Sequence, residues 1–162
     1  MIEIAKLSPD QWELYRDLRL EALTCDPVAF GSSFEEEVEL PKETWLNRIP
    51  NAIFAIEREK PVGLIVWKRE DRIKTRHTAY INSMYVTGKF RGQGIGGKLM
   101  TAAIDSIQAS QGILKIRLSV IAPQVPAFNL YSHFGFRTIG TAKKELYVNG
   151  LYYDEIIMEK ML

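Results

Sequence analysis

The sequence has little cysteine, little histidine and almost no net charge. Cys25 is the one cysteine in 162 residues, so no internal disulfide can form, and we expect a cytoplasmic protein. His77 has no partners at metal-ligand spacing, so no metal is expected. The net charge of +1 gives no reason to expect nucleic acid or a membrane as a partner. No apolar run is long enough to span a bilayer, and no basic-then-apolar leader opens the chain.

The composition, 46% apolar and 25% charged residues, is typical of a globular protein. We expect residues 1–162 to form a single domain in the order β-α-α-β-β-β-α-β-α-β-β. The expected strands cover residues 1–6, 52–58, 62–68, 79–86 and 113–121, a strand that begins at 136–139, and a last hairpin of 143–148 and 152–161. The expected helices run over 8–23, 41–49 and 98–108, and from Pro123 to a cap at Gly135. This order favours an α/β fold with one twisted, mostly antiparallel sheet, about four helices and a parallel pair beside helix 98–108.

A glycine-rich loop joins the strand at 79–86 to the helix at 98–108. It contains Gly92, Gly94, Gly96 and Gly97. Glycine lets the backbone turn tightly and lets another molecule approach it closely. The helix that follows presents unpaired N–H groups and a partial positive charge at its start. The stretch therefore predicts a site for phosphate or pyrophosphate.

Three phosphate-binding patterns overlap in this loop. A P-loop, G-x-x-x-x-G-K, would need Ser or Thr after Lys98 to hold magnesium, and Leu99 stands there. A dinucleotide fingerprint, G-x-G-x-x-G, would follow its strand directly, but residues 87–91 intervene, and strand 114–121 ends without a carboxylate. The third pattern, R-x-x-G-x-G, fits both the spacing and the strand–loop–helix context.

That third pattern, from Arg91 to Gly96, resembles the coenzyme A loop of the GNAT superfamily of N-acetyltransferases. A second segment, 124–136, is similar to the N-x-x-A-x-x-L-Y-x-x-x-G-F pattern that members often show. The matching residues are Ala127, Leu130, Tyr131, Gly135 and Phe136. Gln124 stands where asparagine is usual, and its amide offers the same groups on a longer stem. The resemblance covers nearly the full chain.

The resemblance implies transfer of an acetyl group from acetyl-coenzyme A (acetyl-CoA) to a primary amine of a small molecule or peptide. The amine would attack directly in a ternary complex. One alternative is a non-catalytic acyl-CoA sensor on the same fold, and another is a nucleotide-binding protein that uses residues 92–98. Many members dimerise, so a homodimer is also allowed.

The resemblance further implies a role for individual residues. The glycine loop would cradle the pyrophosphate, and the end of a central strand that splays from its parallel neighbour would hold the pantetheine arm. The residues implied to bind the coenzyme are Met84, Tyr85, Val86, Arg91, Gly92, Gln93, Gly94, Ile95, Gly96, Gly97, Gln124 and Asn129. A main-chain N–H near Tyr85 or Val86 would polarise the thioester carbonyl. Tyr131 would protonate the departing thiolate, because the pKa values of a phenol and a thiol are close.

The sequence identifies the residues that would contact the amine acceptor less specifically than those that would bind the coenzyme. The loop 30–34 and the acidic run 35–37 are a candidate lid over the amine, or else a loop anchored to the core with solvated acids. The candidate acceptor contacts are Phe30, Ser33, Glu35, Tyr80 and Asn82. No carboxylate shares the face of the central strand with Tyr80 and Asn82. The general base is therefore a water chain, an acid such as Glu35 or Glu36, or bulk solvent.

Overall fold

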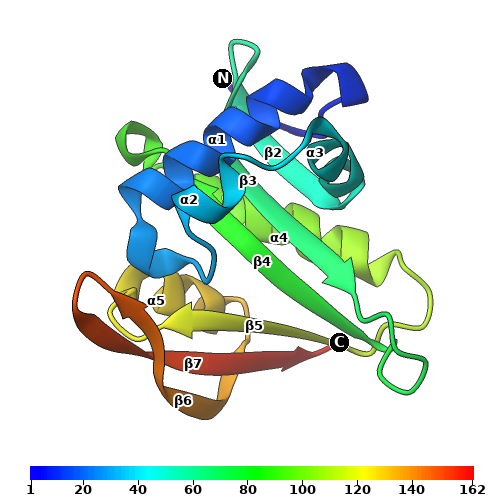
Figure 1. Ribbon diagram of the computed structural model, residues 1–162. Coiled ribbons are helices and arrows are strands. Elements are labelled where there is room, and N and C mark those ends of the chain that lie inside the picture. The colour runs from blue at the N-terminus through cyan, green and yellow to red at the C-terminus, as the bar shows by residue number, and fades with distance from the viewer.

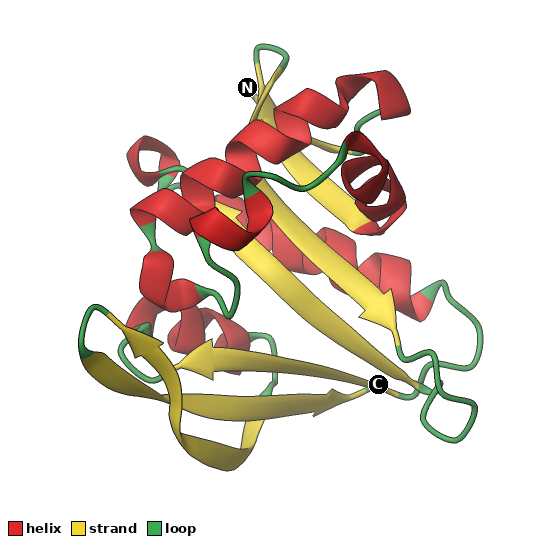
Figure 2. Ribbon diagram, viewed as in Figure 1, coloured by secondary structure: helices red, strands yellow, loops and turns green.

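A single seven-stranded sheet runs through the molecule, as the computed structural model of residues 1–162 shows (Figures 1 and 2). Its strand order is β1-β2-β3-β4-β5-β7-β6, and every neighbouring pair is antiparallel except β4 and β5. The strands are β1 (Ile2–Ala5), β2 (Ala52–Glu57), β3 (Lys60–Arg69), β4 (Thr78–Val86), β5 (Lys115–Ile121), β6 (Arg137–Val148) and β7 (Leu151–Met161).

Helices cover both faces of this sheet. The α-helices are α1 (Trp12–Cys25), α2 (Phe34–Glu37), α3 (Lys42–Arg48), α4 (Ile95–Gln108) and α5 (Val125–His133), and short 3-10 turns lie at Pro9–Gln11, Pro27–Ala29, Ile49–Asn51 and Gly88–Phe90. Helices α1, α2 and α3 lie over one face of β2 to β4, and α4 lies behind those strands (Figure 1). The molecule therefore has three layers.

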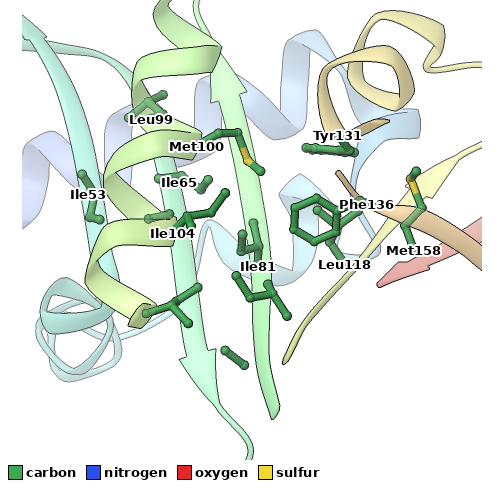
Figure 3. Close-up of a cluster of buried hydrophobic side chains, with 14 of the residues drawn as sticks. Ile53, Ile65, Ile81, Leu99, Met100, Ile104, Leu118, Tyr131, Phe136 and Met158 are labelled. Atoms are coloured by element: carbon green, nitrogen blue, oxygen red, sulfur yellow. The ribbon is translucent and has the colours of Figure 1, made fainter. Parts of the chain in front are cut away.

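The alternation of side chains along each strand explains the two hydrophobic clusters. Ile53 and Ile65 point to α4, whereas their neighbours Phe54 and Leu64 belong to the cluster under α1 and α3. The α4 cluster contains 19 buried residues, and Figure 3 shows Leu99, Met100 and Ile104 of α4 facing the sheet. Strands β2 and β3 contribute side chains to both clusters, so helices cover both of their faces, as is typical of strands in the interior of a sheet.

The parallel pair β4–β5 opens into a fork. Only Thr78, Ala79 and Tyr80 pair with β5, at Lys115, Ile116 and Arg117. Beyond these residues the two strands diverge, as Figure 1 shows, and β7 continues the sheet on the far side of β5. The backbone that the fork leaves unpaired faces a gap between the strands, and this gap positions the site described below.

The expected fold class is confirmed, with three local differences. The acidic run forms a helical turn, α2, so there are five α-helices where about four were expected. A capping box makes this turn: the Ser33 N–H donates to Glu36 Oε2 at 2.7 Å, and the Glu36 N–H donates to Ser33 Oγ at 3.3 Å. The first helix begins with a 3-10 turn at Pro9–Gln11, and β6 is one continuous strand with register shifts.

Candidate functional site

Two cavities meet at the fork between β4 and β5. The first cavity, of about 310 Å³, lies between the glycine loop, the ends of β4 and β5, and α5. The second cavity, of about 450 Å³, lies on the other face of the sheet under α1, α2 and α3. Ser119 of β5 and Ala29 line both cavities. The two cavities are therefore adjacent at the fork.

The glycine loop supplies the first cavity with unused hydrogen-bond donors. The N–H groups of Gly92, Gln93 and Gly94 have no acceptor within the protein, and the first turn of α4 adds those that a helix leaves unpaired. Gly92 and Gly94 have φ angles of +74° and +76°, and nothing lies within 4 Å of a Cβ built on either residue. The loop is an open cradle of N–H groups at a helix N-terminus, which fits the pyrophosphate of coenzyme A.

Arg91 stands at the mouth of the first cavity. Its Nε donates to the carbonyl oxygen of Val86 at 2.8 Å, and its Nη2 pairs with Asp26, which also lines the cavity. Its guanidinium lies 5.4 Å from the centre of the Tyr85 ring. The Tyr85 side chain itself points into the α1 cluster, where its hydroxyl donates to Glu21 Oε1 at 2.9 Å. Tyr85 can therefore serve the cavity only through its backbone.

Tyr131 of α5 lines the first cavity and packs edge-on against Phe136, with ring centres 6.3 Å apart (Figure 3). Tyr131 is 6% exposed. Burial disfavours the phenolate and raises the pKa of Tyr131 to about 12. This value lies well above the thiol range, so the expected pKa match is absent. Tyr131 keeps its proton at neutral pH and is suited to donate a hydrogen bond.

A bulge in β4 marks the fork. Leu64 pairs with Tyr85 and Val66 with Asn82, so Ser83 and Met84 together face the single residue Ile65. Ser83 has a φ of +54°, an uncommon conformation for a residue with a side chain. A bulge leaves backbone groups of its strand unpaired, and here those groups lie where the two cavities approach one another. No motif in the sequence signals this bulge.

The second cavity contains a glutamate that the sequence analysis did not single out. Glu155 of β7 lines it beside Ser119. Glu155 pairs with Ile121 and Ile157 pairs with Ser119, so Glu155 and Ser119 are diagonal neighbours on one face of the sheet. Burial and then the negative charge of Glu145 raise the pKa of Glu155, while the nearby Ser119 hydroxyl lowers it. A carboxylate with a raised pKa is suited to accept a proton.

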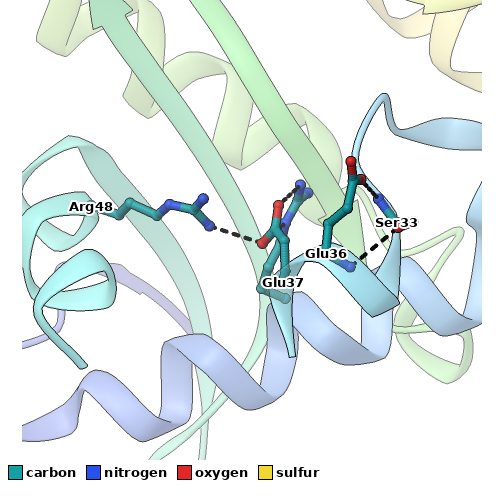
Figure 4. A network of polar contacts seen from close by, with 5 residues as sticks. Ser33, Glu36, Glu37 and Arg48 are labelled. Atoms are coloured by element: carbon teal, nitrogen blue, oxygen red, sulfur yellow. Dashed lines mark hydrogen bonds and ion pairs between the residues drawn. The ribbon is translucent and has the colours of Figure 1, made fainter. Parts of the chain in front are cut away.

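The opposite wall of the second cavity carries a buried ion network. Arg19 of α1 donates to Glu37 through Nε at 3.2 Å and Nη2 at 2.9 Å, and Arg48 of α3 donates through Nη1 at 2.8 Å (Figure 4). Burial pushes the pKa of Glu37 up, but the hydrogen bonds and charges of Arg19 and then Arg48 together hold it below its usual range. The acidic run is therefore not uniformly solvated, because its third residue is 3% exposed.

The predicted site residues fall into four places. Those that line the first cavity are Met84, Tyr85, Val86, Arg91, Gly92, Gly94, Ile95, Gly96, Gln124 and Tyr131. Phe30, Tyr80 and Asn82 line the second cavity. Ser33 and Glu35 line a third cavity, between the segment before α2 and the β6–β7 turn, which Phe30 also borders. Gln93, Gly97 and Asn129 do not line the first cavity, and Asn129 is exposed.

Sequence reasoning missed several further residues of the two cavities, Arg48 among them, and two of these residues left a signal. Arg19 lies on the apolar stripe of its helix with Tyr15 and Ala22, where a charge needs a partner. Glu155 interrupts the apolar residues of a predicted strand. Asp26 and Ser119 left no such signal. The Glu36 side chain, named above as one candidate base, is used in the capping box and lines none of the three cavities.

Two further observations concern metal ions and membranes. No three His, Cys, Asp or Glu side chains are grouped closely enough to hold a metal ion. None of the helices combines the length and the apolar character needed to cross a membrane.

Comparison with known proteins places the chain in a family. A sequence model of the acetyltransferase (GNAT) family matches residues 12–136. An L-amino acid N-acetyltransferase of Escherichia coli strain K12 is 27% identical over 100 residues, which cover 62% of this chain and 61% of that protein. N-alpha-acetyltransferase 30 of Saccharomyces cerevisiae is 36% identical over 76 residues, 47% of this chain and 43% of that protein. The matched region thus spans about half the length of these relatives.

Solved structures agree on the fold. A GNAT-family acetyltransferase of Streptococcus pneumoniae superposes with a TM-score of 0.88 over 100% of both chains at 20% identity. An acetyltransferase, yncA, of Salmonella typhimurium, solved with acetyl-CoA, superposes with a TM-score of 0.85 over 99% of this chain and 94% of its own at 14% identity. The family match extends over most of the chain, from α1 to the start of β6. The chain belongs to the acetyltransferase (GNAT) family.

Proposed function

We propose that this protein is an acetyl-CoA-dependent N-acetyltransferase that acts on a primary amine. The observation that carries the proposal is the meeting of two chemically different cavities at Ser119. One cavity has a cradle of free N–H donors for phosphate, and the other has a carboxylate with a raised pKa for an amine. Holding the two reactants together at the fork is expected to supply much of the rate enhancement.

The first cavity would hold the acetyl donor by its two ends. The N–H groups from Gly92 to the first turn of α4 would bind the pyrophosphate, and Arg91 would approach it after leaving Asp26. The backbone of Met84 to Val86 would bind the pantetheine arm along the open side of β4. When bound, acetyl-CoA supplies the thioester whose carbonyl carbon the amine attacks. A backbone N–H at the bulge would stabilise the negative charge that develops on the carbonyl oxygen.

Glu155 would prepare the amine. An ammonium group is not a nucleophile, so it must lose a proton before it attacks. Glu155 would bind the ammonium in the second cavity and take this proton, directly or through the Ser119 hydroxyl. The overall reaction converts R–NH₃⁺ and acetyl-CoA into R–NH–CO–CH₃, coenzyme A thiol and one released proton. We favour Glu155 over Glu35 and Glu36, the acids named from the sequence, because Glu155 shares a cavity with Tyr80 and Asn82.

Tyr131 would serve the leaving group. Its raised pKa keeps the hydroxyl protonated, so it would donate a hydrogen bond to the sulfur as the C–S bond breaks. The proton released from the amine can then complete the thiol. This assignment keeps Tyr131 at the leaving group, where the L-Y-x-x-x-G-F segment implied it, but as a hydrogen-bond donor rather than as the acid that supplies the proton.

The donor is tested first by thermal unfolding with acetyl-CoA, coenzyme A, NAD and Mg-ATP in parallel. A ligand that binds only the folded state raises the Tm by mass action. We expect a rise with the two coenzyme A compounds, and thiol release when amines are added. A rise with NAD or Mg-ATP alone would contradict the proposal. A rise with acetyl-CoA but no thiol release with any amine would favour the non-catalytic acyl-CoA sensor.

A further inference from the structure

The wall of the second cavity that α1, α2 and α3 form, called the helix wall, has two positive side chains and one negative side chain. Arg19 and Arg48 share a single carboxylate, Glu37. Arg19 donates to Glu37 through Nε and Nη2. The Nη1 atom of Arg19 is the one buried side-chain nitrogen or oxygen in the protein without a hydrogen-bond partner. The side chain of Arg48, which also lines the cavity, is 35% exposed.

A buried guanidinium edge without a partner is costly. Its donors have lost their water and have gained no acceptor in exchange. Phe30 lies under this guanidinium, 4.9 Å from the ring centre to Cζ, and the ring offers no oxygen acceptor. Because arginine favours planar, two-oxygen partners, a carboxylate entering the cavity would satisfy this wall.

The other wall has the opposite charge. Glu155 comes from β7, beyond β5, whereas Arg19 and Arg48 come from helices that lie over β2 to β4 (Figure 1). The negative wall is the one next to Ser119, which also lines the first cavity. An acceptor whose ammonium faces Glu155 and whose carboxylate faces the arginines would be complementary to both walls.

We infer that the acceptor is a free amino acid, with its carboxylate held by Arg19 and Arg48 and its amine turned to Glu155 and Ser119. The inference rests on the proposed acetyl transfer and names the acceptor class of that same site. The first residue of a peptide has its α-carboxyl group in a peptide bond, and a polyamine has no carboxylate, so neither offers an amine with its own α-carboxylate.

The test compares matched acceptors on the unaltered protein. The twenty L-amino acids, their carboxamides, a tripeptide with a free amino end and spermidine are assayed by thiol release from acetyl-CoA. A carboxamide has the more readily deprotonated amine, so without carboxylate recognition it would be the better acceptor. We expect the reverse, a kcat/KM about tenfold or more higher for an amino acid than for its carboxamide.

Variants locate the recognition. Arg48→Gln should raise the KM for the amino acid about tenfold, erase its preference over the carboxamide and leave the KM for acetyl-CoA unchanged. Arg16→Gln is the control and should keep the preference, because Arg16 lies on the same α1 as Arg19 but pairs with Asp17 and does not line the second cavity. Thermal unfolding checks that both variants are folded.

The outcomes separate the inference from the proposed function. Transfer to carboxamides, the tripeptide or spermidine at equal or higher kcat/KM would overturn the inference and leave acetyl transfer standing. An amino acid preference that survives Arg48→Gln would also overturn it. Absence of transfer to every amine, with Tm still raised by acetyl-CoA, would overturn the proposed function and the inference with it.

Discussion

Tyr131 offers the clearest test at the scale of one residue. Tyr131→Phe removes one hydroxyl and keeps the ring that packs against Phe136, so the fold should be retained. We expect kcat to fall roughly 10²-fold, because the developing thiolate loses its hydrogen-bond donor, with the Kd for acetyl-CoA unchanged. Thiol-release kinetics and titration by thermal shift measure the two quantities. Tyr152→Phe, at the exposed turn of β7, is the matched control, and an unchanged kcat for Tyr131→Phe would remove Tyr131 from the mechanism.

The raised pKa of Glu155 predicts how kcat/KM depends on pH. Its folded-state pKa is raised, so the carboxylate that accepts the proton is lost as the pH falls through that raised value. The kcat/KM should therefore have an acidic limb above the ordinary glutamate range, and Glu155→Gln should abolish the limb and lower the rate at neutral pH. Glu145→Gln removes a negative charge that helps to raise this pKa, so the limb should move to lower pH. If neither substitution alters the limb, Glu155 is not the group that titrates.

At the scale of one element, the glycine loop depends on its backbone conformation. Gly94 is the N-cap residue of α4 with a φ of +76°, and space is open around it. Gly94→Ala should therefore cost about 1 kcal/mol of stability through backbone strain alone, without a clash. The strained loop would turn its N–H groups away, so we expect a weaker Kd for acetyl-CoA by about tenfold, measured by calorimetry. Gly140→Ala, in β6 with open space and no positive φ, should leave this Kd unchanged.

The secondary-structure elements also show how much of the fold the sequence can predict. The strand, the glycine loop and the helix could be predicted, because the β4 residues, Arg91 to Gly96 and the apolar stripe of α4 follow one another directly in the chain. The fork of β4 and β5 followed from the family resemblance. The bulge at Ser83 could not be predicted, because a positive φ at serine has no sequence signature. Glu155 could not be assigned to the acceptor side either, since only the pairing of β7 with β5 brings it beside Ser119.

At the scale of the whole molecule, the acidic run shows how charge can be buried rather than solvated. Glu35 lines the third cavity, Glu36 caps α2, and Glu37 joins α1 to α3 through Arg19 and Arg48. A run of acids normally indicates a solvated surface. Here two arginines that lie far apart in the sequence change that outcome, because tertiary packing brings them to the same carboxylate. The helix layer over the second cavity is therefore held together by the same network that lines this cavity.

This network predicts how stability depends on pH. The folded-state pKa of Glu37 is lowered, so its contribution is fully present above the unfolded value near 4.5 and is lost as the pH falls through the folded value. Glu37→Gln leaves two arginines without a counter-charge and should lower the free energy of unfolding at pH 7 by about 3 kcal/mol. Urea unfolding of both proteins at pH 7 and at lower pH should show the difference shrinking below pH 4.5. Glu36→Gln changes a neighbouring acid that has no contact with the arginines, and because glutamine can keep the capping box its effect should stay below about 1 kcal/mol. A gap between Glu37→Gln and the unaltered protein that stays constant with pH would show that Glu37 stabilises the helix layer through packing rather than through its charge.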